Sequence, residues 1–134
     1  MIQTETTIQV RYVETDQMGF VHHQNYVAYF ELARVDMLEK IGVPYHQLEK
    51  DGYMLPVLGI EIQYLMPNTF GDELRIVCMM REMPKVRINI EYEIFRGETL
   101  TTTGSSHHGF MSPKGKAIRP PKYLIEVARP FYEK

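Results

Sequence analysis

Apolar and polar residues alternate along several stretches of this chain, which is the pattern of strands with one buried face. Over residues 86–96, Ile88, Ile90, Tyr92 and Ile94 alternate with charged and amide side chains, and we predict a strand there. The same pattern predicts strands over residues 5–14 and 60–64. Further strands are expected over 72–83 and over 98–111, which is rich in threonine and serine.

The period of the apolar residues changes after the first predicted strand. Apolar side chains then recur at spacings of three and four, which places them on one face of a helix. They are Tyr26, Phe30, Ala33, Met37 and Ile41. Gly42 and Pro44 end this helix, so we expect it to cover residues 25–41, about 25 Å. Shorter helices are expected over 45–51 and 121–133.

A strand, a long helix and then a run of strands joined by short turns is the order of an α+β domain. The strands are expected to be antiparallel, because such short connections cannot cross over between parallel strands. One helix covers only one face of this sheet and leaves its edges open. We therefore expect a homo-oligomer, a dimer or a tetramer, that protects them.

Composition adds limits to this interpretation. A chain of 134 residues with 44% hydrophobic and 24% charged residues is expected to form one domain over 1–134. The net charge of -2 gives no electrostatic reason to expect nucleic acid as a partner. Its start does not resemble a signal peptide, and no apolar run approaches the ~20 residues of a membrane span. We therefore expect a soluble, cytoplasmic protein. Its one cysteine, Cys78, lies in an apolar strand and is interpreted as a core thiol.

The segment between the first strand and the long helix carries candidate chemistry. Asp16 follows the strand, Gly19 allows a tight turn, and His23 stands where the helix begins. The first N–H groups of a helix lack internal partners and can polarise a carbonyl oxygen. A nearby carboxylate can act on the same carbonyl as base or nucleophile. On these residues alone, Asp16 is equally suited to capping a turn.

A family resemblance favours the chemical role. Residues 11–34, RYVETDQMGFVHHQNYVAYFELAR, resemble the signature of the 4-hydroxybenzoyl-CoA thioesterase-like branch of the hotdog superfamily. Residues 60–74, IEIQYLMPNTFGDEL, resemble the second strand of that family, with its Tyr, its Pro and a Gly-Asp turn. The elements of the signature are Asp16, Gly19, Val21-His22-His23, Asn25-Tyr26, Tyr29-Phe30 and Ala33-Arg34.

The resemblance implies a hotdog fold, in which a curved antiparallel sheet of about five to six strands wraps a long central helix. It implies hydrolysis of an acyl-CoA thioester, with Asp16 as general base or nucleophile and the N–H at His23 polarising the carbonyl. Tyr12 and the His23 side chain would line the same site. From their places at the turn and at the helix start, we also take Gly19 and Tyr26 as candidates to bind the substrate; the alternative for Tyr26 is a place in the helix core. The 4-hydroxybenzoyl enzyme has Tyr in place of His23, so the resemblance does not extend to its substrate.

CoA would be part of the substrate, and no separate cofactor is expected. Lys85 and Arg87 flank a turn and are candidates to bind the CoA phosphates, ahead of Arg119 and Lys122. We expect no metal site, because the histidines show no ligand spacing; His107 and His108, as neighbours on a strand, face opposite sides.

Two alternatives stay open at this point. A hotdog hydratase or dehydratase acting on a 3-hydroxyacyl thioester would use His23 and the helix carboxylate Glu31, and would leave Asp16 without a role. A non-catalytic acyl-CoA-binding protein would bind the thioester without releasing thiol. Under the thioesterase interpretation, Glu31 is an ion-pair residue and His22 is secondary.

Overall fold

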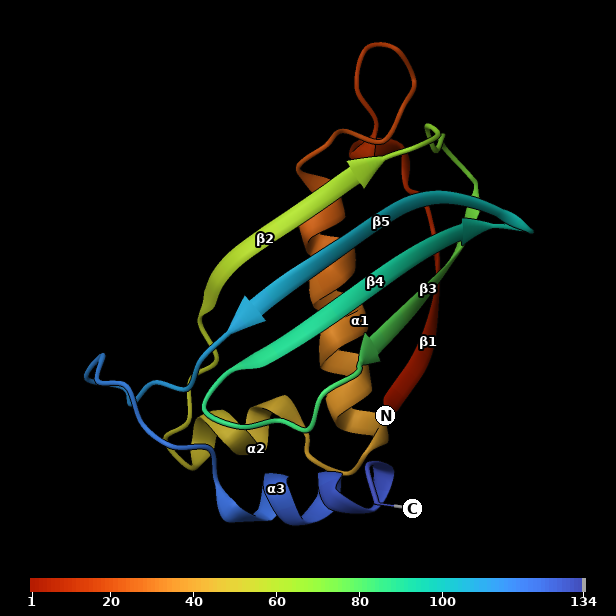
Figure 1. Cartoon of the computed structure of the whole chain (residues 1–134). Helices are drawn as coiled ribbons and strands as arrows, with labels where there is room; N and C mark the ends of the chain where they lie inside the picture. The colour runs from red at the N-terminus through yellow and green to blue at the C-terminus, as the bar shows by residue number, and fades with distance from the viewer. Residues whose placement is uncertain (134) are drawn as a thin grey trace.

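The computed structural model describes residues 1–133 and shows one antiparallel sheet with a long helix on its inner face (Figure 1). The strands lie in the order β1-β3-β4-β5-β2. In chain order the elements are β1 (Ile2–Gln9), the 3-10 turn η1 (Tyr12–Glu14), α1 (Asn25–Lys40), α2 (Tyr45–Lys50), β2 (Val57–Tyr64), β3 (Glu73–Met80), β4 (Ile88–Arg96), β5 (Thr99–His108), α3 (Lys122–Ala128) and the 3-10 turn η2 (Arg129–Phe131).

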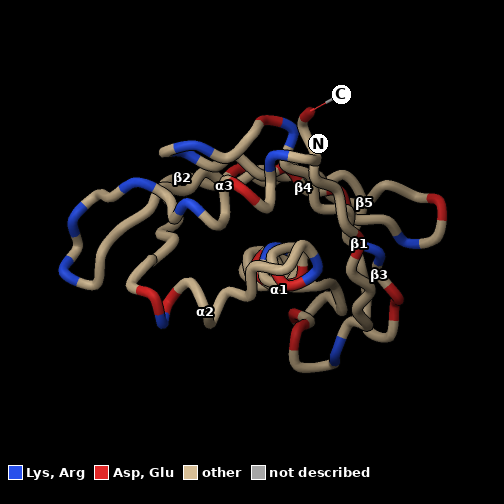
Figure 2. Tube along the Cα trace, turned by 90° about the horizontal axis from the view of Figure 1, so that it is seen from below, with Lys and Arg blue, Asp and Glu red and all other residues tan. Residues whose placement is uncertain are grey.

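The sheet bends along one side of α1, as the view along the helix shows (Figure 2). The α+β fold with a five-stranded antiparallel sheet confirms the expected class. The predicted apolar stripe of α1 is buried against the sheet, except for Ile41, which follows the helix as its half-buried C-cap residue. Gly42, at φ 93°, ends the helix as predicted.

The first strand is where the sequence prediction was wrong. It runs from Ile2 to Gln9 rather than over residues 5–14, and the chain then turns into η1. Glu14 causes the turn: its carboxylate accepts the Arg11 N–H at 2.8 Å and the Arg11 guanidinium at 3.2 Å. These local bonds replace a sheet ladder, and they leave Tyr12 76% exposed instead of on a strand face.

The C-terminal helix is also shorter than the predicted 121–133. It covers Lys122–Ala128 and then tightens into η2, which contains Pro130. Proline lacks the N–H that a continuing α-helix needs. The helix therefore gives way at this residue.

Helix α1 is fixed against the sheet by an aromatic ring that fills the place of a missing side chain. Phe30 stacks on Tyr92 of β4 with ring centroids 4.2 Å apart. A Cβ added at Gly104 of β5 would lie 2.5 Å from the Phe30 ring and 2.8 Å from the Glu61 carbonyl oxygen. Only glycine at position 104 lets this ring approach the strand.

A chain of buried polar groups crosses the core beside this contact. The Arg34 guanidinium donates to the Tyr92 hydroxyl at 3.1 Å, and that oxygen lies 2.7 Å from Ser106 Oγ. Ser106 Oγ in turn lies 2.7 Å from His108 Nε2. Burial lowers the pKa of His108 to about 4, so its ring is neutral at pH 7. His107 is exposed on the opposite side, as predicted.

The single cysteine is a core residue, as expected. Cys78 is fully buried in β3, and its thiol lies 3.7 Å from the sulfur of Met37. Burial raises the pKa of the Cys78 thiol to about 12. The thiol is therefore neutral and sheltered under ordinary conditions.

We predict that Gly104→Ala lowers the free energy of unfolding by about 1–3 kcal/mol, because overpacking displaces Phe30. Urea denaturation measures this. Gly59→Ala on β2 is the matched control, since a Cβ there meets only His107, at an ordinary 3.4 Å. Equal losses in the two variants would contradict the packing role of Gly104.

We also predict that His108 makes stability depend on pH. The unfolded chain binds a proton at His108 near pH 6.5 and the folded chain only near pH 4. The unfolded state therefore gains more protons as the pH falls, and this residue should remove about 2 kcal/mol of stability between pH 7 and pH 5. Urea titrations at both pH values should show a smaller pH dependence for His108→Gln. An unchanged dependence would count against the assignment.

Candidate active site

Asp16 stands in a short hairpin that projects beyond the end of the sheet (Figure 1). Thr15 and Val21 pair at its base, and the Asp16 N–H donates to the Phe20 carbonyl at 2.7 Å. Gly19 turns the tip at φ 81°, a conformation that suits glycine. The structure thus gives Gly19 the turn role that the sequence predicted. We call residues 15–21 the Asp16 hairpin.

The two oxygens of the Asp16 carboxylate have different surroundings. Oδ1 accepts the N–H of Met18 at 2.9 Å and the N–H of Phe20 at 3.1 Å. Oδ2 has no hydrogen-bond partner within residues 1–133. One oxygen therefore holds the loop in shape, and the other stays available for chemistry. The capping role and the chemical role belong to the same side chain.

The start of α1 is tied to the residue two positions before Asp16. The backbone carbonyl of Glu14 accepts the His22 N–H and the Asn25 side-chain amide, each at 2.8 Å. The Tyr29 hydroxyl donates to the Glu14 carboxylate at 3.0 Å, and burial with this contact raises the Tyr29 pKa. Over residues 1–133, the backbone N–H of His23 has no partner. It is thus free to donate to another group.

A cavity of about 340 Å³ lies between the Asp16 hairpin, the start of α1 and the segment that follows β2. We call it the inner recess. Its walls are mostly apolar and aromatic, and Asp16 and His23 supply a carboxylate and an imidazole. It is lined by Asp16, Phe20, Val21, His23, Tyr26, Tyr64, Leu65, Met66 and Pro67.

A second, more open cavity of about 650 Å³ also touches the hairpin, and we call it the outer recess. It is lined by Tyr12, Val13, Thr15, Asp16, Gln17 and His22. Asp16 lines both recesses. The structure therefore brings Asp16 together with His23 and Tyr26 in the inner recess, and with Tyr12 and His22 in the outer recess. The His22 and His23 rings stack with centroids 4.3 Å apart, so the two recesses are neighbours. Tyr12 also packs edge-on against Phe70, with ring centroids 5.6 Å apart.

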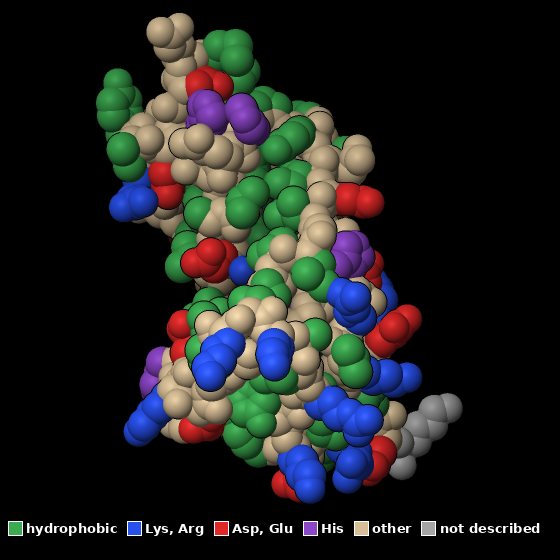
Figure 3. Space-filling view, turned by 90° about the vertical axis from the view of Figure 1, so that its left-hand side faces the viewer, with side chains coloured by type: hydrophobic (Ala, Val, Ile, Leu, Met, Phe, Trp, Pro, Cys, Tyr) green, Lys and Arg blue, Asp and Glu red, His purple; other side chains and the backbone are tan. Residues whose placement is uncertain are grey.

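Lys85 and Arg87 lie at the opposite end of the sheet, where β4 begins (Figure 1). Arg87 lines an apolar cavity of about 240 Å³ with Leu58, Phe110 and other residues near the start of β2. Lys and Arg side chains gather toward this end of the molecule (Figure 3). A single chain therefore does not bring these cations to Asp16.

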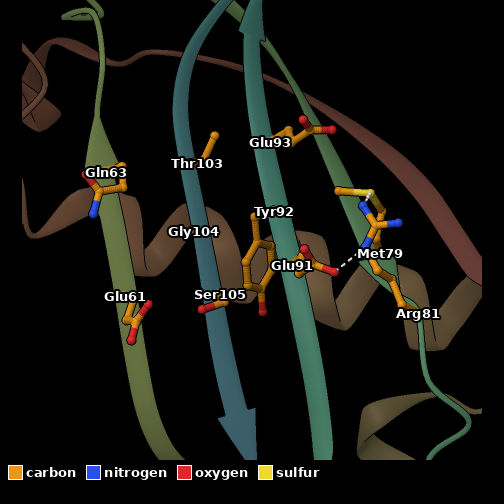
Figure 4. A pocket seen from close by; sticks show the side chains of 10 residues that line it. All are labelled: Glu61, Gln63, Met79, Arg81, Glu91, Tyr92, Glu93, Thr103, Gly104 and Ser105. Atoms are coloured by element: carbon orange, nitrogen blue, oxygen red, sulfur yellow. Dashed lines mark hydrogen bonds and ion pairs between the residues drawn. The ribbon is translucent and has the colours of Figure 1, made fainter.

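The outer face of the sheet carries a recess of about 280 Å³ that lacks these features (Figure 4). Its carboxylates project from the middle of strands, and Glu91 is paired with Arg81. Within residues 1–133 no helix starts at this outer surface, so these residues offer no set of free helix N–H groups to a carbonyl oxygen in the recess. The cavities at the two ends of β2 are therefore stronger candidates for substrate binding than this recess.

The remaining expectations from the sequence concern Glu31, metal ions and membrane spans. Glu31 is exposed on α1 and forms no salt bridge within residues 1–133, so the ion-pair interpretation finds no partner there. Over the same residues, no group of three His, Cys, Asp or Glu side chains could hold a metal ion. No helix in this part of the chain is long and apolar enough to cross a membrane.

The sequence interpretation missed Glu14 and Asn68 as residues that shape this site, and it named Asn25 only as part of the family signature. Glu14 and Asn25 link the Asp16 hairpin to α1, as described above. Asn68 follows Pro67 in a segment that reads simply as a turn. Only the tertiary contacts distinguish these residues from ordinary turn and cap residues.

Comparisons with known proteins identify the family of this chain. Residues 10–127 match the sequence model of the Thioesterase-like superfamily. A Bacillus subtilis protein with the provisional name acyl-CoA thioesterase YneP is 34% identical over 102 residues, which are 75% of this chain and 74% of that protein.

Solved structures give the same result. A DHNA-CoA thioesterase from Staphylococcus aureus is 32% identical, with a TM-score of 0.90, over 98% of this chain and 89% of that one. A 4-hydroxybenzoyl-CoA thioesterase bound to its substrate is only 16% identical. Its TM-score is 0.86 over 96% of this chain and 99% of that one, which shows a shared fold.

Proposed function

The chain belongs to the thioesterase-like superfamily, and we propose that it hydrolyses acyl-CoA thioesters with Asp16 as the catalytic carboxylate. The observation that carries this proposal is that the two carboxylate oxygens of Asp16 have different surroundings. Oδ1 is held by two backbone N–H groups of the hairpin, while Oδ2 is unbonded within residues 1–133 at the edge of the inner recess. A fixed carboxylate with one free oxygen is what a base or a nucleophile requires.

Two routes use this oxygen. As a base, Oδ2 takes a proton from water while the water oxygen attacks the thioester carbon. The carbon–sulfur bond then breaks, the CoA thiolate takes up the proton held by Asp16, and free CoA and the acid leave. As a nucleophile, Oδ2 attacks the carbon itself, expels the thiolate and forms an anhydride that water hydrolyses. Both routes give the same products, but the base route leaves room for one water between Oδ2 and the thioester carbon, whereas the nucleophilic route brings the two into direct contact.

The carbonyl oxygen develops negative charge in either route, and the backbone N–H of His23 is suited to receive it. This N–H has no partner within residues 1–133 and lies just before α1. The positive end of the helix dipole adds to the attraction. The His23 side chain lines the inner recess with Asp16 and is available to orient the thioester. Tyr12 and His22 line the outer recess, which also reaches Asp16.

The inner recess is suited to the acyl group. The rings of Phe20, Tyr26 and Tyr64 line it, and Tyr26 meets Tyr64 edge-on with centroids 5.2 Å apart. Aromatic walls gain offset or edge contacts with a flat aromatic acyl group that a small aliphatic group cannot make. We therefore favour an aromatic acyl-CoA, a class that includes the substrate named for the Staphylococcus aureus relative.

We predict that Asp16→Asn lowers thiol release about 10²–10⁴-fold, because the amide cannot act as base or nucleophile. Its Oδ1 can still accept the Met18 and Phe20 N–H groups, so the hairpin should persist. Glu31→Gln, another carboxylate-to-amide change on α1, is the matched control and should stay active. The assay should compare naphthoyl-, benzoyl-, acetyl- and palmitoyl-CoA, with the aromatic esters cleaved best.

More than a tenth of wild-type activity in Asp16→Asn would overturn the assignment. The same assay tests the alternatives. A hydratase or dehydratase would convert 3-hydroxyacyl-CoA to the enoyl product without free thiol. A binding protein would bind the esters and release nothing. The sequence resemblance alone did not separate these outcomes.

We further propose that the protein acts as a homodimer joined along β2. This strand is an edge of the sheet, and Val57, Leu58 and Ile60 on it are at least 37% exposed. An apolar edge strand left open invites pairing with another chain. Antiparallel pairing of β2 with its copy would protect both edges at once and close with two-fold symmetry.

This arrangement would also unite the two halves of the site. The cavity beside Arg87 lies at the start of β2, and the inner recess lies at its end. These ends are about 25 Å apart for a strand of eight residues. Antiparallel pairing places the start of one strand beside the end of the other. Lys85 and Arg87 of the partner subunit could then bind the CoA phosphates while Asp16 meets the thioester.

We predict that the double variant Leu58→Lys, Ile60→Lys is monomeric, because charges on the shared edge repel each other. Light scattering after size exclusion measures the mass. Leu32→Lys on the exposed face of α1 is the control, since Leu32 is 53% exposed and lies away from β2. It should leave the β2 dimer intact. A dimeric double variant would place the interface elsewhere.

A further inference from the structure

We propose that Asn68 is a positioning residue that aligns the Asp16 hairpin with the start of α1. The proposal rests on the proposed thioester hydrolysis at Asp16. Asn68 is fully buried and is not among the lining residues of either recess. It nevertheless contacts three separate parts of the inner-recess wall, and it adds a residue that the family signature in this sequence does not include.

The first contact is to the hairpin. The backbone carbonyl of Asn68 accepts the Val21 N–H at 2.8 Å, and the adjacent Thr69 pairs with Phe20. Val21 and Phe20 both line the inner recess. Movement of the Asn68 backbone would therefore move the side of the hairpin to which Asp16 Oδ1 is bonded.

The second contact is to the helix. The Asn68 side-chain amide donates to the Tyr26 hydroxyl at 3.2 Å and to Thr101 Oγ1 at 3.0 Å. Tyr26 lies in the first turn of α1, three residues beyond the His23 N–H. The third part of the wall is Pro67, the covalent neighbour of Asn68. One side chain and its backbone thus join the hairpin, the helix start and the segment after β2.

Arg96 fixes the orientation of the Asn68 amide. Its guanidinium donates to Asn68 Oδ1 at 3.3 Å and to the Pro67 carbonyl at 2.6 Å. Because a guanidinium can only donate, the amide oxygen must face Arg96 and the NH₂ must face Tyr26. The hydrogen bonds therefore run in one direction, from the end of β4 to the start of α1.

Such a link bears on rate because the free oxygen of Asp16 and the His23 N–H belong to different segments. Both must reach one carbonyl, and an error of about 1 Å in their relative position can cost 10²-fold in rate. Loss of the Asn68 side chain would loosen this alignment without removing either group. The expected signature is a lower kcat with a nearly unchanged KM.

The test replaces Asn68 with Leu, which has similar size and no polar atoms. We expect kcat for the best acyl-CoA to fall 10- to 100-fold and KM to change less than threefold. Hydrogen exchange of the amides of residues 15–23 should accelerate at least tenfold. The control is Ser106→Ala, which removes another fully buried, hydrogen-bonded side chain at a distance from both recesses. It should lower stability and leave kcat and this exchange unchanged.

Arg96→Met provides a second variant in case Asn68→Leu does not fold. It removes the contact that orients the amide and should lower kcat three- to tenfold, again with faster exchange over residues 15–23. Normal kcat and normal exchange in the folded variants, beside an inactive Asp16→Asn, would overturn the role of Asn68 and leave the proposed function standing. If the wild type releases no thiol, the proposed function fails, and the exchange experiment still decides whether Asn68 holds the hairpin.

Discussion

The hydrogen bonds of one carboxylate oxygen support the site. Asp16 Oδ1 accepts two N–H groups of its own hairpin and so closes the loop that presents the other oxygen. A longer or more flexible side chain at this position would either lose the hydrogen bonds to the Met18 and Phe20 N–H groups or leave the second oxygen poorly oriented. The hairpin is in turn held from two sides, by the Glu14 carbonyl and by the Asn68 carbonyl. The rest of the fold serves to keep these two anchor points at a fixed separation.

The sheet and α1 provide that fixed separation. Phe30 fills the space left by Gly104 and stacks on Tyr92, so the helix can neither slide nor rise without losing this contact. Glu14 follows β1, and Asn68 lies between β2 and β3. Elements distant in sequence therefore meet at one end of the helix. This explains why a reactive group can stand on a loop and still be well placed.

Periodic patterns predicted the elements well because burial alone decides them. The alternation in β4 and the stripe on α1 reflect which face meets the core, and both were read from the sequence correctly. The end of β1 was misplaced because the Glu14 side chain competes with the sheet for the backbone of Arg11. The spacing of apolar residues along the chain does not reveal such a hydrogen bond between a side chain and the backbone.

The candidate site divides in the same way. Asp16, His23 and Gly19 could be identified from one contiguous segment, since their spacing is local. The placement of Tyr12 and His23 in different recesses could not, because it depends on the direction in which η1 turns. No pattern in the sequence marked Asn68 as part of the site either. Its importance comes from partners in α1, β4 and β5 that only the fold brings together.

The sheltered state of Cys78 has a consequence for an enzyme whose product is itself a thiol. Free CoA and its disulfides exchange readily with accessible thiolates, and a surface cysteine could become capped as turnover proceeds. Here the one cysteine of the chain is fully buried, with a pKa raised to about 12. The protein should therefore tolerate accumulating product and shifts in the redox poise of its surroundings without covalent self-inactivation.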